Sequence, residues 1–147
     1  MLRVEELLET KSKELLTIEQ SQSVADAVGQ MAEQQIGALI VVDGGKPVGV
    51  FTERDVLKTW VRHTKAHDTR FRDIPLKTVM TRDLIVAGPG DSLDYVVSVM
   101  IKRRIRHVPI VEGNRIVGVL SMRDVVQSYV TNLKVEIQHL KESTSID

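Results

Sequence analysis

The sequence predicts an α+β fold built from two copies of one small unit. Residues 15–58 align without a gap on residues 84–127 after a shift of 69 positions, and 13 of the 44 aligned pairs are identical. In each copy, the spacing of apolar residues indicates the order strand–helix–strand–strand–helix. Two copies are too few, and 69 residues too long a period, for a solenoid. We therefore expect a pseudo-two-fold pair in which each unit covers the other's apolar face, with two related clefts between them.

The first copy carries start and stop signals for its elements. A short apolar segment at 15–18 is followed by Ser23, a favourable helix N-cap, and then by apolar residues at helical spacing. Residues 38–42 are apolar without a break, which is typical of a strand buried on both faces. The sequence Asp-Gly-Gly-Lys at 43–46 is a hairpin signal before a returning strand. A second helix is predicted to start at Thr52.

The second copy repeats this order, with a first strand at 84–87, a helix from Ser92 to Arg104, two strands joined by a turn, and a helix from Ser121. The predicted boundaries are residues 7–61 for the first unit, 62–73 for a linker, 74–130 for the second unit, and 131–147 for a C-terminal helical extension and tail.

The C-terminal helix is predicted to continue past the second unit. Its apolar residues advance by 4, 3, 4 and 3, which is the spacing of a coiled coil; they are Val126, Val130, Leu133, Ile137 and Leu140. This stripe could pack on the N-terminal helix of its own chain, which contains Leu2, Leu7 and Leu8, or on a second chain. We favour a contribution to a homodimer.

Composition excludes several classes of protein. The chain has no cysteine, which rules out disulfides, thiolate catalysis and cysteine-ligated metal and fits a reducing compartment. A net charge of zero and only five aromatic residues argue against nucleic-acid partners. The longest apolar stretch, 38–42, is too short to span a membrane. His63 and His67 lie four residues apart without an apparent third ligand, so no metal is predicted. We expect a soluble, cytoplasmic protein with no nucleic-acid or membrane partner.

One motif stands at the same place in both copies. It consists of Gly, two apolar residues, Thr or Ser, any residue, Arg and Asp, and its members are Gly49, Thr52, Arg54 and Asp55, then Gly118, Ser121, Arg123 and Asp124. A hydroxyl three residues before an acid at a helix start indicates a capping box. The second interpretation is a ligand site, where Asp accepts hydrogen bonds from the vicinal hydroxyls of a ribose and Arg pairs with phosphate. A glycine inside a strand is consistent with close approach of such a ligand. The two interpretations can coexist.

Taken together, these features resemble a tandem pair of cystathionine-β-synthase-type (CBS) domains of the stand-alone kind. The resemblance covers about residues 7–130 and rests on both motif copies and on the sequences VMTRD at 79–83, PGDSL at 89–93 and RHVPIV at 106–111. It implies two β-α-β-β-α repeats packed sheet to sheet. It also implies a regulatory module without catalytic activity, which binds AMP, ADP, ATP or a related adenosyl ligand such as NAD or S-adenosylmethionine. Dimerisation into a flat disc is frequent in this family. The regulated protein partner is unknown.

The resemblance assigns roles to individual residues. Asp55 and Asp124 would hold ribose hydroxyls, with Thr52 and Ser121 beside them and Arg54 and Arg123 facing phosphate. The remaining positions would line the ligand's base and its surroundings; they are Thr17, Ile18, Gly37, Ala38, Val86, Ala87, Arg106, His107 and Pro109. Asp124 is expected to work with Thr17, Ile18 and Ala38 of the other repeat. Asp55 is expected to work with Val86, Ala87 and His107.

The two sites are not expected to be equivalent. The second repeat has Arg106-His107 where the first has the small pair Gly37-Ala38, so cations gather near Asp124 and its site should be the tighter one. Alternatively, Arg106 fills this cleft and leaves the Asp55 site dominant. A competing function is a structural dimerisation module with vestigial clefts. An enzyme is disfavoured because no catalytic triad, phosphate-binding glycine loop or metal cluster is visible in the sequence.

Overall fold

The computed structural model describes residues 2–10, 16–66 and 70–144. Its elements in chain order are α1 (Val4–Thr10), β1 (Thr17–Glu19), α2 (Val24–Gln34), β2 (Ala38–Asp43), β3 (Lys46–Thr52), α3 (Glu53–Lys65), η1 (Phe71–Asp73), η2 (Leu76–Thr78), α4 (Leu93–Arg103), β4 (His107–Glu112), β5 (Arg115–Ser121) and α5 (Met122–Thr144). Three predicted features lie outside the described residues: the start of the strand at 15, His67 of the histidine pair, and the tail at 145–147.

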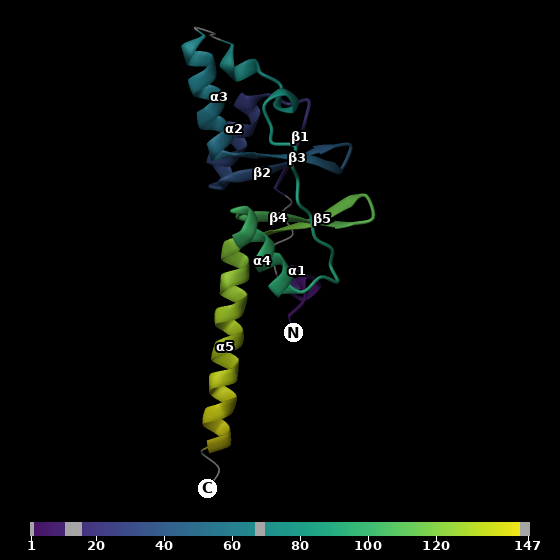
Figure 1. Cartoon of the computed structure of the whole chain (residues 1–147), viewed down its shortest axis with the longest axis vertical. Helices are drawn as coiled ribbons and strands as arrows, with labels where there is room; N and C mark the ends of the chain where they lie inside the picture. The colour runs from purple at the N-terminus through teal and green to yellow at the C-terminus, as the bar shows by residue number, and fades with distance from the viewer. Residues whose placement is uncertain (1, 11–15, 67–69, 145–147) are drawn as a thin grey trace.

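Two sheets face each other at the centre of the molecule, with helices on the outer sides (Figure 1). In the first sheet, β1 is parallel to β2 and β2 is antiparallel to β3, while β4 and β5 form an antiparallel pair. Buried Ile40, Val42 and Val119 form an apolar layer between the sheets, with Val50 and Ile116 packed against it. The predicted α+β fold with sheet-to-sheet packing is therefore confirmed.

The outer face of each sheet is covered by the helices of its own repeat. Because side chains alternate along a strand, Leu39 and Val41 of β2 point away from the layer that Ile40 and Val42 occupy. They join α2 in the first core, whereas Val108 and Ile110 of β4 join α4 in the second core. The uninterrupted apolar run at 38–42 thus reflects a strand with a core on each side.

Helix starts and ends follow the predicted signals. Ser23 caps α2 by accepting a hydrogen bond from the backbone N–H of Asp26 at 3.1 Å. Ser92 caps α4 in the same way through the N–H of Tyr95 at 3.2 Å. Both helices end at a residue in the left-handed conformation, Gln35 and Arg104, each with φ of 56°. The repeated units therefore share their backbone detail as well as their element order.

The strand predicted at 84–87 is the main difference from expectation. Only Ala87 pairs with β4, through a single parallel bridge to Ile110. In the first repeat, the corresponding ladder is extended by the N–H groups of Gln20 and Ile40, which donate to Val42 and Leu16 at 2.9 Å each. Prolines stand at both equivalent positions, 89 and 109, and proline has no N–H to donate. The second sheet therefore has two strands instead of three.

The segment that leads into each repeat packs on the other repeat. Val4 of α1 is fully buried in the core of the second repeat, and Leu76 of η2 is fully buried in the core of the first. The backbone bonds are equivalent: the N–H of Val4 donates to Asp91, and the N–H of Leu76 donates to Gln22, both at 2.9 Å. The two cores consequently depend on each other.

Helix α3 extends past its predicted end, whereas α5 begins where expected. Helix α3 continues to Lys65, well into the segment predicted as linker at 62–73, and η1 occupies its end. Helix α5 begins on the body of the molecule, where Tyr129, like Leu7 and Leu8 of the same chain, packs against the core of the second repeat. It then projects far beyond the sheets (Figure 1). No helix among the described residues is long and apolar enough to cross a membrane.

Candidate functional site

In each repeat, the candidate site forms where the last strand passes into the following helix. Ala38 pairs with Thr52 in one sheet, and His107 pairs with Ser121 in the other. The backbone N–H of Glu53 donates to the carbonyl of Gly37 at 3.0 Å, and that of Met122 donates to Arg106 at 2.8 Å. The structure therefore brings Gly37-Ala38 next to Thr52 in the first repeat. In the second repeat it brings Arg106-His107 next to Ser121.

Asp55 is enclosed by hydrogen bonds from its own chain. One carboxylate oxygen, Oδ2, accepts from the backbone N–H of Thr52 at 2.9 Å and from its hydroxyl at 3.2 Å. The other, Oδ1, accepts from the hydroxyl of Thr81 at 3.1 Å. Asp55 is only 8% exposed. The capping box is thus present with Asp in place of the commoner Glu, and three of the roughly four acceptor sites of the carboxylate are already occupied by donors of the same chain.

Asp124 occupies the equivalent position in the second repeat. Its Oδ2 accepts from the backbone N–H of Ser121 at 2.9 Å, and its own N–H donates to the Ser121 hydroxyl at 3.1 Å. Its side chain is partly exposed, unlike that of Asp55. The segment leading into the first repeat has Glu9 at the position that Thr81 occupies in the segment leading into the second. An ionised carboxylate has no hydrogen to donate, so Glu9 cannot give Asp124 the hydrogen bond that Thr81 gives Asp55. The two acids therefore have the same cap but different surroundings.

The glycines of the repeated motif have a packing role, whereas the expected close approach of a ligand stays a prediction. A Cβ on Gly49 would lie 2.7 Å from the carbonyl oxygen of Thr81 and 2.9 Å from the sulfur of Met80. A Cβ on Gly118 would lie 2.7 Å from a methyl group of Leu8. Both glycines are buried where the leading segment of the other repeat crosses the strand. This crossing explains why the strands tolerate glycine.

The residues predicted to line the base differ in the direction of their side chains. Ile18 and Ala87 are buried in the helix-side cores, at 3% and 6% exposure, so only their backbone could face a ligand between the sheets. Alternation along the strands places Ala38 and Pro109 on the opposite side, towards the other repeat. Val86 is 42% exposed. The predicted partnership of each acid with residues of the other repeat stays a prediction.

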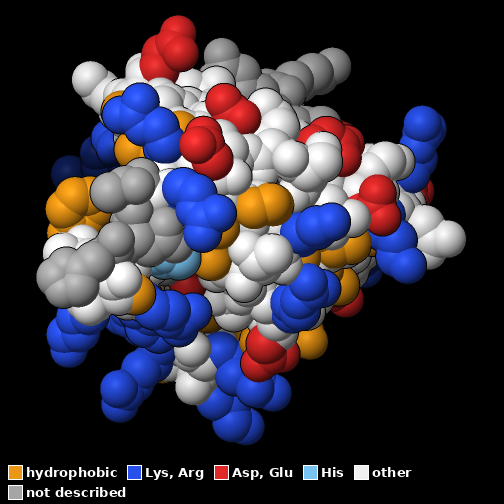
Figure 2. All heavy atoms as spheres, turned by 90° about the horizontal axis from the view of Figure 1, so that it is seen from above, with side chains coloured by type: hydrophobic (Ala, Val, Ile, Leu, Met, Phe, Trp, Pro, Cys, Tyr) orange, Lys and Arg blue, Asp and Glu red, His pale blue; other side chains and the backbone are white. Residues whose placement is uncertain are grey.

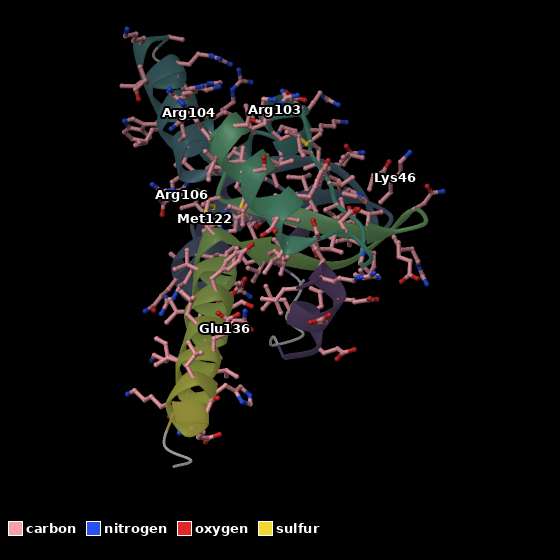
Figure 3. All side chains as sticks on the ribbon, turned by 60° about the horizontal axis from the view of Figure 1, so that its bottom comes forward. Lys46, Arg103, Arg104, Arg106, Met122 and Glu136 are labelled. Atoms are coloured by element: carbon pink, nitrogen blue, oxygen red, sulfur yellow. The ribbon has the colours of Figure 1, made fainter. Side chains whose placement is uncertain are left out.

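Cations gather around the start of α5. Arg106 and Arg123 are exposed, as is Arg54 at the first site. Figure 3 shows Arg103 and Arg104 at the end of α4, and Arg106 beside Met122, the first residue of α5. Seen from the α3 end, Lys and Arg side chains also gather along one edge of the molecule (Figure 2). Exposed arginines of the second repeat thus lie near the start of α5, and their role at a ligand site stays a prediction.

A groove between two helices of the first repeat was missed from the sequence. It is a groove of about 660 Å³ between α2 and α3, lined by Val28, Met31, Ala32, Gln35, Ile36, Gly37, Glu53, Val56 and Leu57. Of the predicted site residues, only Gly37 lines it. Apolar Val56 and Leu57 side by side on one helix were the available signal. Among the described residues, no cluster of three or more His, Asp or Glu side chains could hold a metal ion.

The chain belongs to the CBS domain family, whose model matches residues 4–62 and 76–131. It is therefore a tandem pair of CBS domains, as the resemblance implied. The matched segments begin close to α1 and η2, which places each leading segment inside its domain.

Individual relatives agree with this assignment. The chain is 27% identical over 124 residues to the CBS domain-containing protein YhcV of Bacillus subtilis, covering 84% of this chain and 85% of that protein. Its structure is similar to that of the CBS domain protein NE2398, with a TM-score of 0.77, 30% identity and coverage of 88% and 99%. It shares its fold with CBSX2, solved in complex with AMP, at a TM-score of 0.76, 21% identity and coverage of 89% and 98%. Other matching relatives are longer, and the chain spans 22–62% of them.

Proposed function

We propose that this CBS pair is a homodimeric sensor that binds an adenine nucleotide beside Asp124 and transmits occupancy through a change in shape or partner affinity. The observation that carries the proposal is the contrast between the two acids. Asp55 is almost fully buried, at 8% exposure, whereas Asp124 is partly exposed and lies near exposed arginines. The AMP complex of the similarly folded CBSX2 supports the class of ligand.

The chemistry around Asp124 suits a nucleotide. A carboxylate at a helix start can accept two ribose hydroxyls, each bond to a charged group contributing about 1.5–3 kcal/mol. The exposed guanidinium groups of Arg106 and Arg123 can pair with phosphate oxygens in a bidentate manner. Neutralising phosphate in this way should favour ligands with more phosphate groups. AMP, ADP and ATP are the first ligands to test, followed by NAD and S-adenosylmethionine.

Calorimetric titration of Asp124→Asn and the matched variant Asp55→Asn tests this assignment. We expect Asp124→Asn to weaken nucleotide binding more than about tenfold, since one lost charge-assisted bond exceeds 1.4 kcal/mol. Asp55→Asn should mainly lower stability, because it disturbs a buried cap. A ligand that binds wild type and both variants alike would contradict the role of Asp124. Loss of binding in Asp55→Asn alone would move the site to the first repeat.

Arg106→Ala distinguishes a phosphate contact from a plug. Weaker binding, with the loss greatest for ATP and smaller at high salt, supports the phosphate role, because salt screens exposed charges over about 10 Å at 0.1 M. Tighter binding, or a second site that becomes filled, would show that the Arg106 side chain occupies the cleft.

The homodimer is supported by apolar side chains that both repeats expose at equivalent positions. Leu57 and Val61 of α3 are 66% and 49% exposed, and their counterparts Val126 and Val130 of α5 are 51% and 45% exposed. A repeated apolar stripe of this kind is typical of an interaction surface. It also favours the second candidate function, a dimerisation module whose clefts stay empty. That function becomes the better one if none of the five ligands binds. Cytoplasmic location stays a prediction.

A further inference from the structure

We infer that α5 pairs with α5 of a second copy of this chain as a parallel two-stranded coiled coil between residues 126 and 140. The inference rests on the proposed homodimer and adds its orientation, register and charge pairs. The stripe that forms the seam consists of Val126, Val130, Leu133, Ile137 and Leu140, and each of these side chains is between 45% and 67% exposed. A continuous apolar stripe along a helix that projects from the body calls for a partner.

The choice of apolar residues indicates the number of strands and their direction. With Val130 and Ile137 at heptad position a, Leu133 and Leu140 fall at position d, and Val126 at the d position where the stripe begins. β-branched residues at a with leucine at d favour parallel dimers over higher oligomers. Val135 is 50% exposed on the same helix but lies at position f, on the opposite side from the seam. It provides an internal control for every test of the seam.

The charges beside the seam also select the parallel orientation. Glu136 lies at position g and Lys141 at position e of the next heptad. In a parallel pair, g of one helix faces the following e of the other, so two Glu136–Lys141 contacts form between the copies. An antiparallel pair would instead bring g to g and e to e, which places like charges together. Figure 3 shows Glu136 on the part of α5 that lies beyond the sheets.

The arrangement of the body is compatible with this orientation. In the view of Figure 1, α3 and α5 lie along the same side of the molecule, one above the other. A two-fold axis parallel to α5 on that side would bring α3 to α3 and α5 to α5 of the second copy. It would cover Leu57 and Val61 together with the α5 stripe. The stripe spans about two heptads, fewer than the three or four of an autonomous coiled coil, so both contacts are needed.

Disulfide trapping tests the register directly, because the chain has no cysteine of its own. In a parallel coil, Leu140→Cys places the new thiol opposite the same residue of the second copy, and mild oxidation should link most of the protein into dimers. Val135→Cys should stay largely monomeric on a non-reducing gel. In an antiparallel coil, residue 140 would face the other end of the stripe. Equal cross-linking of the two variants, or none for Leu140→Cys, would overturn the inference.

Charge reversal provides a second measurement by sedimentation equilibrium. Glu136→Lys and Lys141→Glu should each raise the dimer dissociation constant by roughly three- to tenfold, and the double variant should restore it. Glu142→Lys at position f is the matched control and should have no effect. Circular dichroism checks that each variant is folded. Failure of the double variant to restore dimerisation would exclude the charge pairs.

A separate variant distinguishes this inference from the proposed function. Leu57→Asp places a charge beside Val61 on the exposed apolar face of α3 and should weaken the dimer whether or not α5 pairs with α5 of the second copy. If Leu57→Asp dissociates the dimer but Leu133→Asp does not, the dimer is correct and the coiled coil is wrong. Nucleotide titration of Leu133→Asp should resemble wild type, so loss of the coil is not confused with loss of the ligand site.

Discussion

At the residue scale, Gly49 and Gly118 occupy equivalent positions in the two repeats, but different kinds of atoms pack against them. Each glycine lies under the leading segment of the other repeat. At Gly49 the neighbour is the Thr81 carbonyl, a backbone atom that is also held by reciprocal hydrogen bonds with Val50 at 2.9 Å. At Gly118 the neighbour is the end of the Leu8 side chain, which can change rotamer. Equivalent positions thus differ in how much they can adjust.

We therefore expect Gly49→Ala to destabilise the protein by about 1–3 kcal/mol, as overpacking against fixed atoms does. Gly118→Ala should stay within about 1 kcal/mol of wild type, because alanine also restricts the unfolded chain. Urea unfolding followed by circular dichroism measures both. Gly29→Ala is a useful control, since a Cβ there would meet nothing within 4 Å and should stabilise α2. Equal losses at the two motif glycines would contradict the packing explanation.

At the scale of elements, α5 is fixed to the body by the hydroxyl of Tyr129, which donates a hydrogen bond to the carboxylate of Asp94 on α4. This hydrogen bond, burial and the Asp94 charge raise the pKa of Tyr129 to about 12. The folded state thereby favours the protonated phenol more than the unfolded chain does, where the pKa is about 10. The contact links the base of the projecting helix to the second repeat.

The raised pKa of Tyr129 makes the stability of the folded state depend on pH, and the direction of this dependence can be predicted. Because the folded-state pKa is the higher one, the stabilising contribution is complete below pH 10 and is lost as pH rises towards 12. Wild type should melt at a higher temperature than Tyr129→Phe at pH 8–9, and this difference should shrink between pH 10 and 12. Tyr95→Phe controls for loss of one phenol hydroxyl. A difference that grows with pH in this range would show that the Asp94 contact does not stabilise the fold.

At the scale of the whole molecule, the exchange of leading segments joins two similar repeats into one cooperative unit. Leu76, next to the second repeat in sequence, is fully buried in the core of the first. Val4 makes the reciprocal contribution to the core of the second. Neither repeat can complete its core from its own consecutive residues.

Unfolding of wild type should consequently be a single transition seen alike by fluorescence of Trp60 in the first repeat and by far-UV circular dichroism. Leu76→Ala removes buried methyl groups from a full core and should cost about 2–5 kcal/mol. Its effect should appear as a shift of that one transition at fixed protein concentration. Separate transitions for the two probes would show that the repeats fold independently and that the exchange contributes little.

Local signals in the sequence determined most of the elements. Ser23, Ser92 and the hairpin at 43–46 act within a few residues, so helix starts and turns could be assigned without knowing what packs on them. The run at 38–42 indicated a strand with two buried faces, and the repeat itself indicated the paired architecture. The strand missing at 84–87 was also accessible in principle, since Pro89 and Pro109 remove two ladder donors.

Tertiary structure alone decided how the repeated motif is used. The sequence identified Asp55 and Asp124 as equivalent, and their caps are indeed the same. Their difference arises from a distant residue, Thr81, which reaches Asp55 across 26 positions of sequence. This crossing and the reciprocal one of α1 over the second repeat also assign Gly49 and Gly118 to packing. Such contacts, whether hydrogen bonds or apolar packing, join residues far apart in the chain, so no local sequence pattern predicts them.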